Sequence, residues 1–390
     1  MTSYFSNELP EEHNSDIDAV ARRDVTAASV PTYEFADDAE VVTPDPIRPH
    51  PNIAWAVVWM FAFWIIQLAV SVGVAIIAIV VAMVQGDGSR EQIEQGVANL
   101  SEVMIPVGTL TSVVTAIVIS VAFYRQRFVE KLSLRGMTWQ QTIASLLAVL
   151  PFAVIASEVT NWAGEFLPSF NTEVLSEFAA SPWPLVFVTA CVFPAIGEEI
   201  FCRGFLGRGL VANHGVVTGV FVASLLFGVM HIDPVQSVGA FVLGLGLHFI
   251  YLATRSLVAP MLVHMLNNSF AFWMMSNYEW CPLPGLSPLP DGTLVHTPAN
   301  VMIAAIFATA ALFSLLYQTR TYWRTSIGDT DGECDHSWSP GFITAEMPPV
   351  ENGYVAVSTK PQLWAIVAIV VSYGALVAAL AVESQAASRL

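Results

Sequence analysis

The sequence predicts an all-α membrane protein, a bundle of about eight to nine transmembrane helices. Composition is the first observation: of the 390 residues, 55% are hydrophobic and only 12% are charged. Charged residues make up about a quarter of a typical soluble domain. The mean hydropathy is +0.60, and several apolar runs reach the roughly 20 residues that cross a bilayer as a helix. A soluble protein could not bury so many apolar residues.

Nine apolar segments account for this prediction in chain order. They lie at about 53–84, 103–124, 141–167, 184–210, 216–233, 235–254, 257–276, 299–318 and 363–382. The first run is long and the central segments follow one another closely, so the number of spans is set at eight to nine.

Four regions follow from this pattern: an acidic tail at 1–52, a transmembrane domain at 53–320, a flexible loop at 321–361 and an additional C-terminal span at 362–390. The first fifty residues carry eleven acids, several prolines and few large apolar residues. Such a stretch cannot bury enough surface to fold alone, which predicts a disordered tail. Its negative charge argues against nucleic acid as a partner.

Lys and Arg in the short loops predict the orientation, because such residues favour the cytoplasmic side. The connection after the second segment contains Arg125, Arg127, Lys131 and Arg135. The pattern predicts a multi-pass protein of the cell membrane with a cytoplasmic N-terminus. The first fifty residues have no apolar core typical of a signal peptide, so we expect the first span to direct insertion.

Ionisable side chains inside apolar spans are costly and are therefore candidates for function. The middle third of the chain concentrates them, together with one amide. The candidate site residues are Glu198, Glu199, Arg203, His231, His264 and Asn268.

Spacing predicts that Glu198 and His231 lie at the same depth. They stand 17 residues before and 16 residues after Gly215, where the chain is expected to turn. Two straight antiparallel helices with a rise of about 1.5 Å per residue would bring them level. A carboxylate and an imidazole at one depth can share a water molecule or a metal ion.

Two pairs have the i,i+4 spacing that places side chains on one helix face. Glu199 and Arg203 are predicted to form an intramembrane ion pair, which leaves Glu198 to act as the acid or base. His264 and Asn268 are the second pair, and the amide of Asn268 can donate a hydrogen bond to an oxyanion.

Each of these residues also has a possible structural role in place of a catalytic one. A single histidine or asparagine in a membrane helix commonly links helices through hydrogen bonds, and Arg203 could extend to the membrane surface. Glu158 and His248 are interpreted as structural. The coincidence of two acids, two histidines and an amide within about seventy residues favours a site.

Three short motifs in order resemble a known family. Glu198 to Arg203 matches EExxxR, Phe227 to His231 matches FxxxH, and His264 to Asn268 matches HxxxN. These are the motifs of the CPBP family (CAAX protease and bacteriocin-processing, also called Abi), which includes CAAX prenyl protease 2. The resemblance covers about residues 180–275.

The resemblance implies a central intramembrane catalytic core that hydrolyses a peptide bond of a membrane-embedded or lipid-associated peptide or protein. It implies that Glu198 activates the attacking water, with His231 and His264 beside it, and that Asn268 stabilises the oxyanion. Glu199 belongs to the same site and Arg203 supports it. Two mechanisms stay open: a glutamate-activated water without metal, or zinc held by Glu198, His231 and His264 with water as the fourth ligand.

Other functional classes remain open at this level. A noncatalytic membrane scaffold or immunity factor could retain the same fold, and a proton-coupled transporter could use Glu198 and the histidines as a relay. The acidic tail, the 321–361 loop and the last span look like additions to the family core. The acidic N-terminus and the lack of eukaryotic targeting signals fit a bacterial protein, in which prenylated substrates are not expected.

Overall fold

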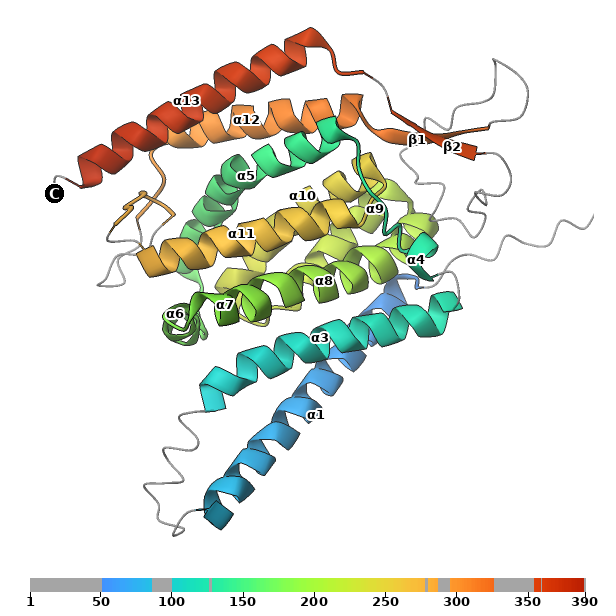
Figure 1. Ribbon diagram of the computed structural model, residues 1–390, viewed down its shortest axis with the longest axis vertical. Helices are drawn as coiled ribbons and strands as arrows, with labels where there is room; N and C mark the ends of the chain where they lie inside the picture. The colour runs from blue at the N-terminus through green and yellow to red at the C-terminus, as the bar shows by residue number, and fades with distance from the viewer. Residues whose placement is uncertain are drawn as a thin grey trace, which may run out of the picture. The chain divides into compact units, whose positions relative to one another are not determined.

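The computed structural model describes residues 51–85, 100–125, 128–277, 280–286, 295–325, 354–358 and 360–388. The chain divides into two units, 1–45 and 46–390, and every described residue belongs to the second. That unit is a bundle of helices, which confirms the all-α fold class (Figure 1). The predicted acidic tail lies outside the described residues except for positions 51 and 52.

The long helices lie close to the predicted spans. They are α1 (Ile53–Gln85), α3 (Leu100–Tyr124), α5 (Trp139–Phe166), α10 (Pro234–Thr254), α11 (Val258–Asn277), α12 (Ala299–Gln318) and α13 (Leu363–Ala387). Two short helices, α4 (Phe128–Lys131) and α6 (Thr172–Ala179), lie between them. The remaining helical segment is continuous from α7 (Trp183–Val186) through η2 (Phe187–Val192), α8 (Phe193–Glu199) and η3 (Ile200–Gly207) to α9 (Arg208–Val229).

Seven helical segments of the described chain are long and apolar enough to cross a membrane. The difference from the nine predicted segments has two sources. The predicted span 184–210 and residues 216–229 of the predicted span 216–233 fall within one 47-residue segment, Trp183–Val229. The predicted span 257–276 corresponds to α11, which contains a histidine and three asparagines and is not among the seven.

The 47-residue segment reverses direction at Gly215, as the sequence predicts. Gly215 has φ 79° and ψ 168°, a backbone conformation that glycine adopts without steric cost. Beyond it, a Cβ placed on Gly219 would lie 2.5 Å from the Cα of Val211. In a straight helix these two positions would be about 12 Å apart. The segment therefore folds back on itself and crosses the bundle twice.

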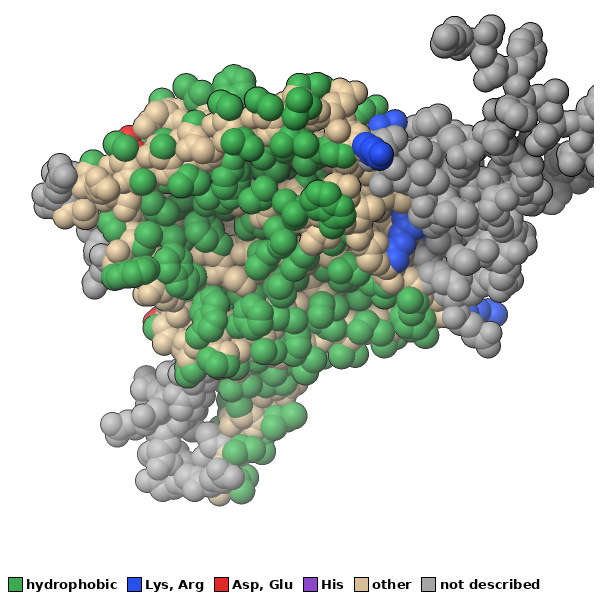
Figure 2. All heavy atoms as spheres, turned by 45° about the horizontal axis from the view of Figure 1, so that its top comes forward, with side chains coloured by type: hydrophobic (Ala, Val, Ile, Leu, Met, Phe, Trp, Pro, Cys, Tyr) green, Lys and Arg blue, Asp and Glu red, His purple; other side chains and the backbone are tan. Residues whose placement is uncertain are grey.

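On the face that Figure 2 shows, the described surface is mainly apolar, as expected for helices that face lipid tails. Along α1, the side chains of Ile65, Leu68 and Ile77 are each more than 60% exposed. Inside, one apolar cluster joins α1 and α3 to η3, α9 and α10, and a second joins α5, α10, α11, α12 and α13. The segment η3, which carries Arg203 and is buried along its length, thus lies between helices that isolate it from lipid.

Two glycines allow helices near the candidate site to approach closely. A Cβ on Gly197 would lie 2.9 Å from the backbone nitrogen of Val113, so α8 packs directly against the backbone of α3. A Cβ on Gly244 would lie 3.1 Å from the Cβ of Ser224, where α10 packs on α9. Both contacts hold the backbone next to the predicted site residues.

The predicted flexible loop at 321–361 has strands at its two ends. The strands β1 (Thr321–Thr325) and β2 (Tyr354–Ser358) pair antiparallel, with Thr321 opposite Ser358 (Figure 1). The part of this loop between them, 326–353, lies outside the described residues.

A polar cluster ties the segment before α12 to α5. The imidazole of His296 forms two hydrogen bonds, each at 2.9 Å. Its Nδ1 contacts Oε1 of Glu158, and its Nε2 contacts Oε1 of Glu165. The backbone N–H of Thr297 also donates to Glu158, at 2.7 Å, and the ring of Trp162 packs against the imidazole. Glu158 therefore has the structural contacts that its sequence interpretation expected.

The interaction of His296 with the two glutamates is expected to weaken as the pH rises. Hydrogen bonds to Glu165 and then Glu158 raise the pKa of His296 above its ordinary value. The pKa of His296 is therefore higher in the folded protein than in the unfolded chain. Protonation of His296 stabilises the folded state fully below the ordinary histidine pKa of about 6.5, and this stabilisation is lost as the pH rises through the folded-state pKa. Thermal unfolding of the wild type and His296→Gln should therefore differ most at acidic pH, and the difference should shrink toward alkaline pH. His214→Gln, at the Gly215 turn, is the control, and a pH-independent difference for His296→Gln would contradict the expectation.

Candidate active site

The two adjacent glutamates lie where an α-helix changes into a π-helix. Glu198 and Glu199 are the last residues of α8, and the π-helical segment η3 begins at Ile200. A second π-helical segment, η2, ends immediately before α8. The prediction of matched depth assumed straight α-helices, and that assumption is wrong here. Single-turn π-helical insertions are frequent at functional sites because they redirect side chains.

The predicted ion pair between Glu199 and Arg203 is present. A guanidinium nitrogen of Arg203 donates to Oε1 of Glu199 at 2.7 Å, and the two side chains are 1% and 0% exposed. A second nitrogen donates to the carbonyl of Gly244 at 3.1 Å. The guanidinium also lies over the ring of Phe227, 4.2 Å from its centroid. Arg203 is therefore held inside the bundle, and the interpretation that it extends to the membrane surface is wrong.

His264 connects the ion pair to Glu198. Its Nδ1 lies 2.9 Å from Oε1 of Glu199, the same oxygen that Arg203 contacts, so the ring N–H donates to the carboxylate. Its Nε2 faces Oε2 of Glu198 at 3.9 Å. That distance is too long for a direct hydrogen bond, yet one water molecule could contact both atoms.

Glu198 is the glutamate whose carboxylate is available. Its side chain is 16% exposed, whereas that of Glu199 is fully buried. Among the described residues, nothing forms a hydrogen bond with Oε2 of either glutamate, but Oε1 of Glu199 is bound by Arg203 and His264. A buried carboxylate oxygen without a protein partner is costly unless water or a substrate supplies one. The two adjacent acids thus have different environments, as the sequence predicts.

His231 is held by the backbone just after α9. Its Nδ1 lies 2.9 Å from the carbonyl oxygen of Phe227, which can only accept, so Nδ1 carries the proton and Nε2 is an acceptor. The ring of Phe227 packs edge-on against both histidines, with centroids 5.1 Å from His231 and 5.7 Å from His264. The same aromatic ring therefore contacts His231, His264 and Arg203.

Asn268 bonds to the backbone of the facing helix. Its amide nitrogen donates to the carbonyl of Ala190, in η2, at 3.1 Å. Pro194, four residues after Ala190, has no N–H and so cannot form the α-helical hydrogen bond to this carbonyl. One amide hydrogen of Asn268 is used in this contact, and the second is available for another acceptor.

Glu198, His231 and His264 are the residues that a zinc ion would need as ligands here. Both histidines donate Nδ1–H to a fixed acceptor, as zinc-binding histidines commonly do. However, the described residues contain no group of three His, Cys, Asp or Glu side chains arranged to hold a metal ion. The set Glu198, His231 and His264 does not fit a three-ligand site in this arrangement.

Sequence reasoning missed three elements of the site. Phe227 was quoted only as the first residue of a motif, but its ring contacts three site residues. The carbonyls of Gly244 and Ala190 orient Arg203 and Asn268. Backbone carbonyls give no sequence signal, although Pro194, four residues after Ala190, hints at one of them.

His248, which has a structural interpretation, lies outside this network. It is fully buried, and a Cβ placed on Gly207 would lie 2.5 Å from its ring. Its ring packs against that of Tyr251, with centroids 6.1 Å apart. The imidazole thus fills the space that Gly207 leaves open between η3 and α10.

Comparison with known protein families gives one match. Residues 180–270 match the family model described as type II CAAX prenyl endopeptidase Rce1-like. The matched range includes all six candidate site residues, and it confirms the resemblance drawn from the three motifs. Comparison with curated proteins and with solved structures gives no match.

Proposed function

From the match of residues 180–270 to the type II CAAX prenyl endopeptidases, we propose that this multi-pass membrane protein is an intramembrane endopeptidase. Its substrate is a membrane-embedded or lipid-associated peptide or protein. The observation that carries the proposal is the chain of contacts from Arg203 through Glu199 to His264, which ends at Glu198. In this series of contacts, the carboxylate of Glu198 and Nε2 of His264 face the same space inside an apolar helical bundle.

Glu198 is the general base in this proposal. A water molecule between Oε2 of Glu198 and Nε2 of His264 loses a proton to the carboxylate as its oxygen attacks the peptide carbonyl carbon. The C–N bond of the tetrahedral intermediate then breaks, and Glu198 returns the proton to the leaving amine. The net result is peptide hydrolysis with one water consumed and Glu198 regenerated.

The histidines orient the reactants. Because Nδ1 of His264 donates to Glu199, its Nε2 accepts the second hydrogen of the attacking water. His231 presents the same kind of nitrogen from the end of α9. The free amide hydrogen of Asn268 donates to the developing oxyanion, a contribution that is large where water is excluded.

Glu199 and Arg203 are positioning residues. Arg203 balances the charge of Glu199, and Glu199 in turn sets the ring orientation and tautomer of His264. A protonated Nδ1 is what leaves Nε2 facing Glu198. The pair acts on the reaction only through His264.

We propose the orientation that the loop charges predict, with the N-terminus in the cytoplasm. On the face that Figure 2 shows, Lys and Arg side chains gather at the end where α12 finishes, and the few visible acidic side chains lie at the opposite end. Arg135, Arg208 and Arg255 also belong to the loops or helix ends on the basic side. Positive charge at one end of a bundle supports a cytoplasmic location for that end.

Hydrolysis in ¹⁸O-labelled water tests the proposed function. Purified protein in lipid nanodiscs is incubated with a panel of transmembrane peptides, and the products are analysed by mass spectrometry. We expect new termini, with one ¹⁸O atom in the new carboxyl group. Absence of cleavage across the panel would favour the noncatalytic scaffold. Loss of cleavage on chelation, together with one zinc ion per chain, would contradict the metal-free step.

A further inference from the structure

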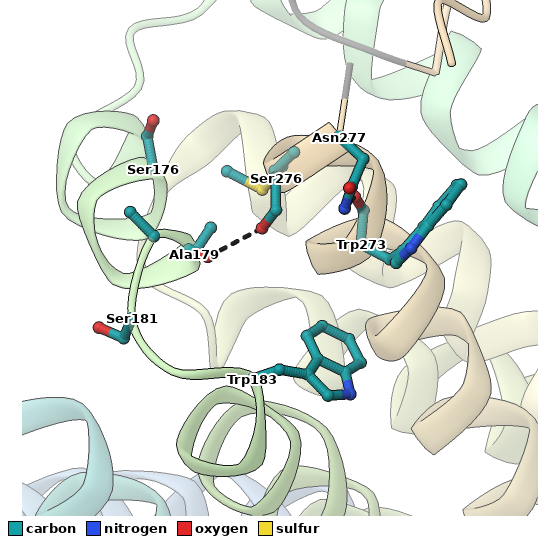
Figure 3. A pocket seen from close by; sticks show the side chains of 9 residues that line it. Ser176, Ala179, Ser181, Trp183, Trp273, Ser276 and Asn277 are labelled. Carbon is teal, nitrogen blue, oxygen red and sulfur yellow. Dashed lines mark hydrogen bonds between the residues drawn. The ribbon is translucent and has the colours of Figure 1, made fainter. Parts of the chain in front are cut away.

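A cavity of about 730 Å³ opens at one end of the bundle, where α6, α7 and the end of α11 meet (Figure 3). Trp183 and Trp273 border it, and Ser176, Ser276 and Asn277 supply hydroxyl and amide groups. None of the six candidate site residues lines it. It is therefore separate from the space between Glu198 and His264.

The cavity and the site lie on the same helices. Along α11, His264, Asn268 and Met275 are spaced by four and seven residues, so they share one helix face, and Met275 lines the cavity. Eleven residues of helix separate His264 from Met275, which corresponds to about 16 Å. An extended peptide covers that distance with about five residues.

The stretch between the cavity and the site is apolar. A cluster of the buried Phe178, Val186 and Ala190, with Ile105 and Phe272 packed against it, lies along this part of the helices. Because these side chains are buried against one another, a substrate segment that extends from the cavity to Glu198 would have to displace part of this cluster.

Three helix ends border the cavity: the carboxyl-terminal ends of α6 and α11, and the amino-terminal end of α7, which begins at Trp183. The carboxyl-terminal ends of α6 and α11 meet there, and the hydroxyl of Ser276 joins them by donating to the carbonyl of Ala179 at 2.8 Å (Figure 3). Helix carboxyl ends carry partial negative charge and favour cations. α6 also carries Glu173 and Glu177, which do not line the cavity, and α6, α7 and α11 contain no Lys or Arg.

The two indole rings add a second attraction for a cation. Lys and Arg side chains bind the faces of tryptophan rings, and this interaction strengthens where water is partly excluded. Trp183 is 42% exposed at the rim, so its ring is accessible to a ligand. Serine and asparagine oxygens beside it can accept hydrogen bonds from an ammonium or guanidinium group.

We propose that this cavity binds a Lys or Arg side chain of the substrate, just outside the substrate's membrane-embedded segment and about five residues from the bond that is cleaved. The inference rests on the proposed endopeptidase function for the identity of the ligand as substrate. Charge complementarity selects the basic residue, and the separation along α11 determines its distance from the scissile bond.

A binding assay tests the proposal apart from catalysis. The probe is a synthetic peptide with an apolar span of about 20 residues and a single Lys beyond one end, and its matched control has Gln instead. Binding is measured in nanodiscs on the Glu198→Gln protein, so that no turnover occurs. We expect the Lys peptide to bind about tenfold more tightly than the Gln peptide, from the combined cation–π and helix-end attraction.

Variants inside and outside the cavity test whether the preference for the Lys peptide arises there. The Lys preference should disappear in Trp183→Leu and Trp273→Leu, and it should persist in Trp139→Leu, an exposed tryptophan on α5 outside the cavity. If the tryptophan variants fail to fold, Glu173→Gln with Glu177→Gln on the surface of α6 should still reduce the preference. Equal affinity for the two peptides would overturn the cation site whether or not the wild type hydrolyses peptides. A clear Lys preference without any hydrolysis would instead refute the endopeptidase and leave the cation site standing.

Discussion

The Glu198→Gln variant is expected to cleave membrane peptides at least about 10³-fold more slowly than the wild type, within the range that general acid–base catalysis contributes. Glutamine has nearly the same shape as glutamate but cannot take the proton of the attacking water. Its amide can still occupy the space facing His264, so we expect the thermal unfolding temperature to stay close to the wild-type value. Single-turnover cleavage of a peptide identified by ¹⁸O labelling measures the effect.

A glutamate outside the site is the control for this experiment. Glu383→Gln alters an exposed carboxylate on α13 that bonds to Asn300, and cleavage should stay at the wild-type rate. Retention of full activity by the purified, folded Glu198→Gln protein would exclude Glu198 as the base. The transporter hypothesis would regain support if the same variant abolished substrate-dependent proton flux in proteoliposomes.

The Glu199→Gln variant should lose about 3–5 kcal/mol of unfolding free energy, because it leaves the buried guanidinium of Arg203 without its counter-charge. Arg203 is 1% exposed, so water cannot replace the carboxylate. The double variant Glu199→Gln with Arg203→Met removes both charges and should recover much of the lost stability. Equilibrium unfolding in mixed detergent and SDS micelles measures all three proteins.

The cleavage rate of the double variant shows whether Glu199 and Arg203 position His264 or only stabilise the fold. The double variant should be folded yet remain slow in cleavage, because no carboxylate sets the tautomer of His264. Arg320→Met, at the end of α12 where the arginine packs over Tyr317, is the control for loss of a positive charge. A double variant with both full stability and full activity would show that the pair has no influence on the reaction.

The helices were predictable from sequence, and the candidate site residues could be selected from it, because both depend on local patterns. Apolar runs of about 20 residues identify spans whatever their neighbours are. The i,i+4 spacing of Glu199 and Arg203 was enough to predict their ion pair, and Gly215 marked the turn. The cost of burying charge made the two glutamates and two histidines visible against an apolar background.

Straight-helix geometry failed where the backbone departs from it. The π-helical segments η2 and η3 on either side of α8 change the direction of Glu198 and Glu199, and periodicity gives no sign of them. Depth matching predicted one level for Glu198 and His231, and the structure adds that Nε2 of His264 faces Oε2 of Glu198 at 3.9 Å. The segment at 321–361 likewise has paired strands at its ends that its polar composition did not predict.

By itself, the sequence determined that this chain is a helical membrane protein with Glu198, Glu199, Arg203, His231, His264 and Asn268 as its candidate site. Those features follow from residue chemistry and short spacing. Only the tertiary structure decided that His264 contacts Glu199 and faces Glu198, and that Phe227 and two backbone carbonyls orient the site. The physical reason is that these contacts join residues far apart in the chain, through helix packing and π-helical geometry that no local pattern encodes.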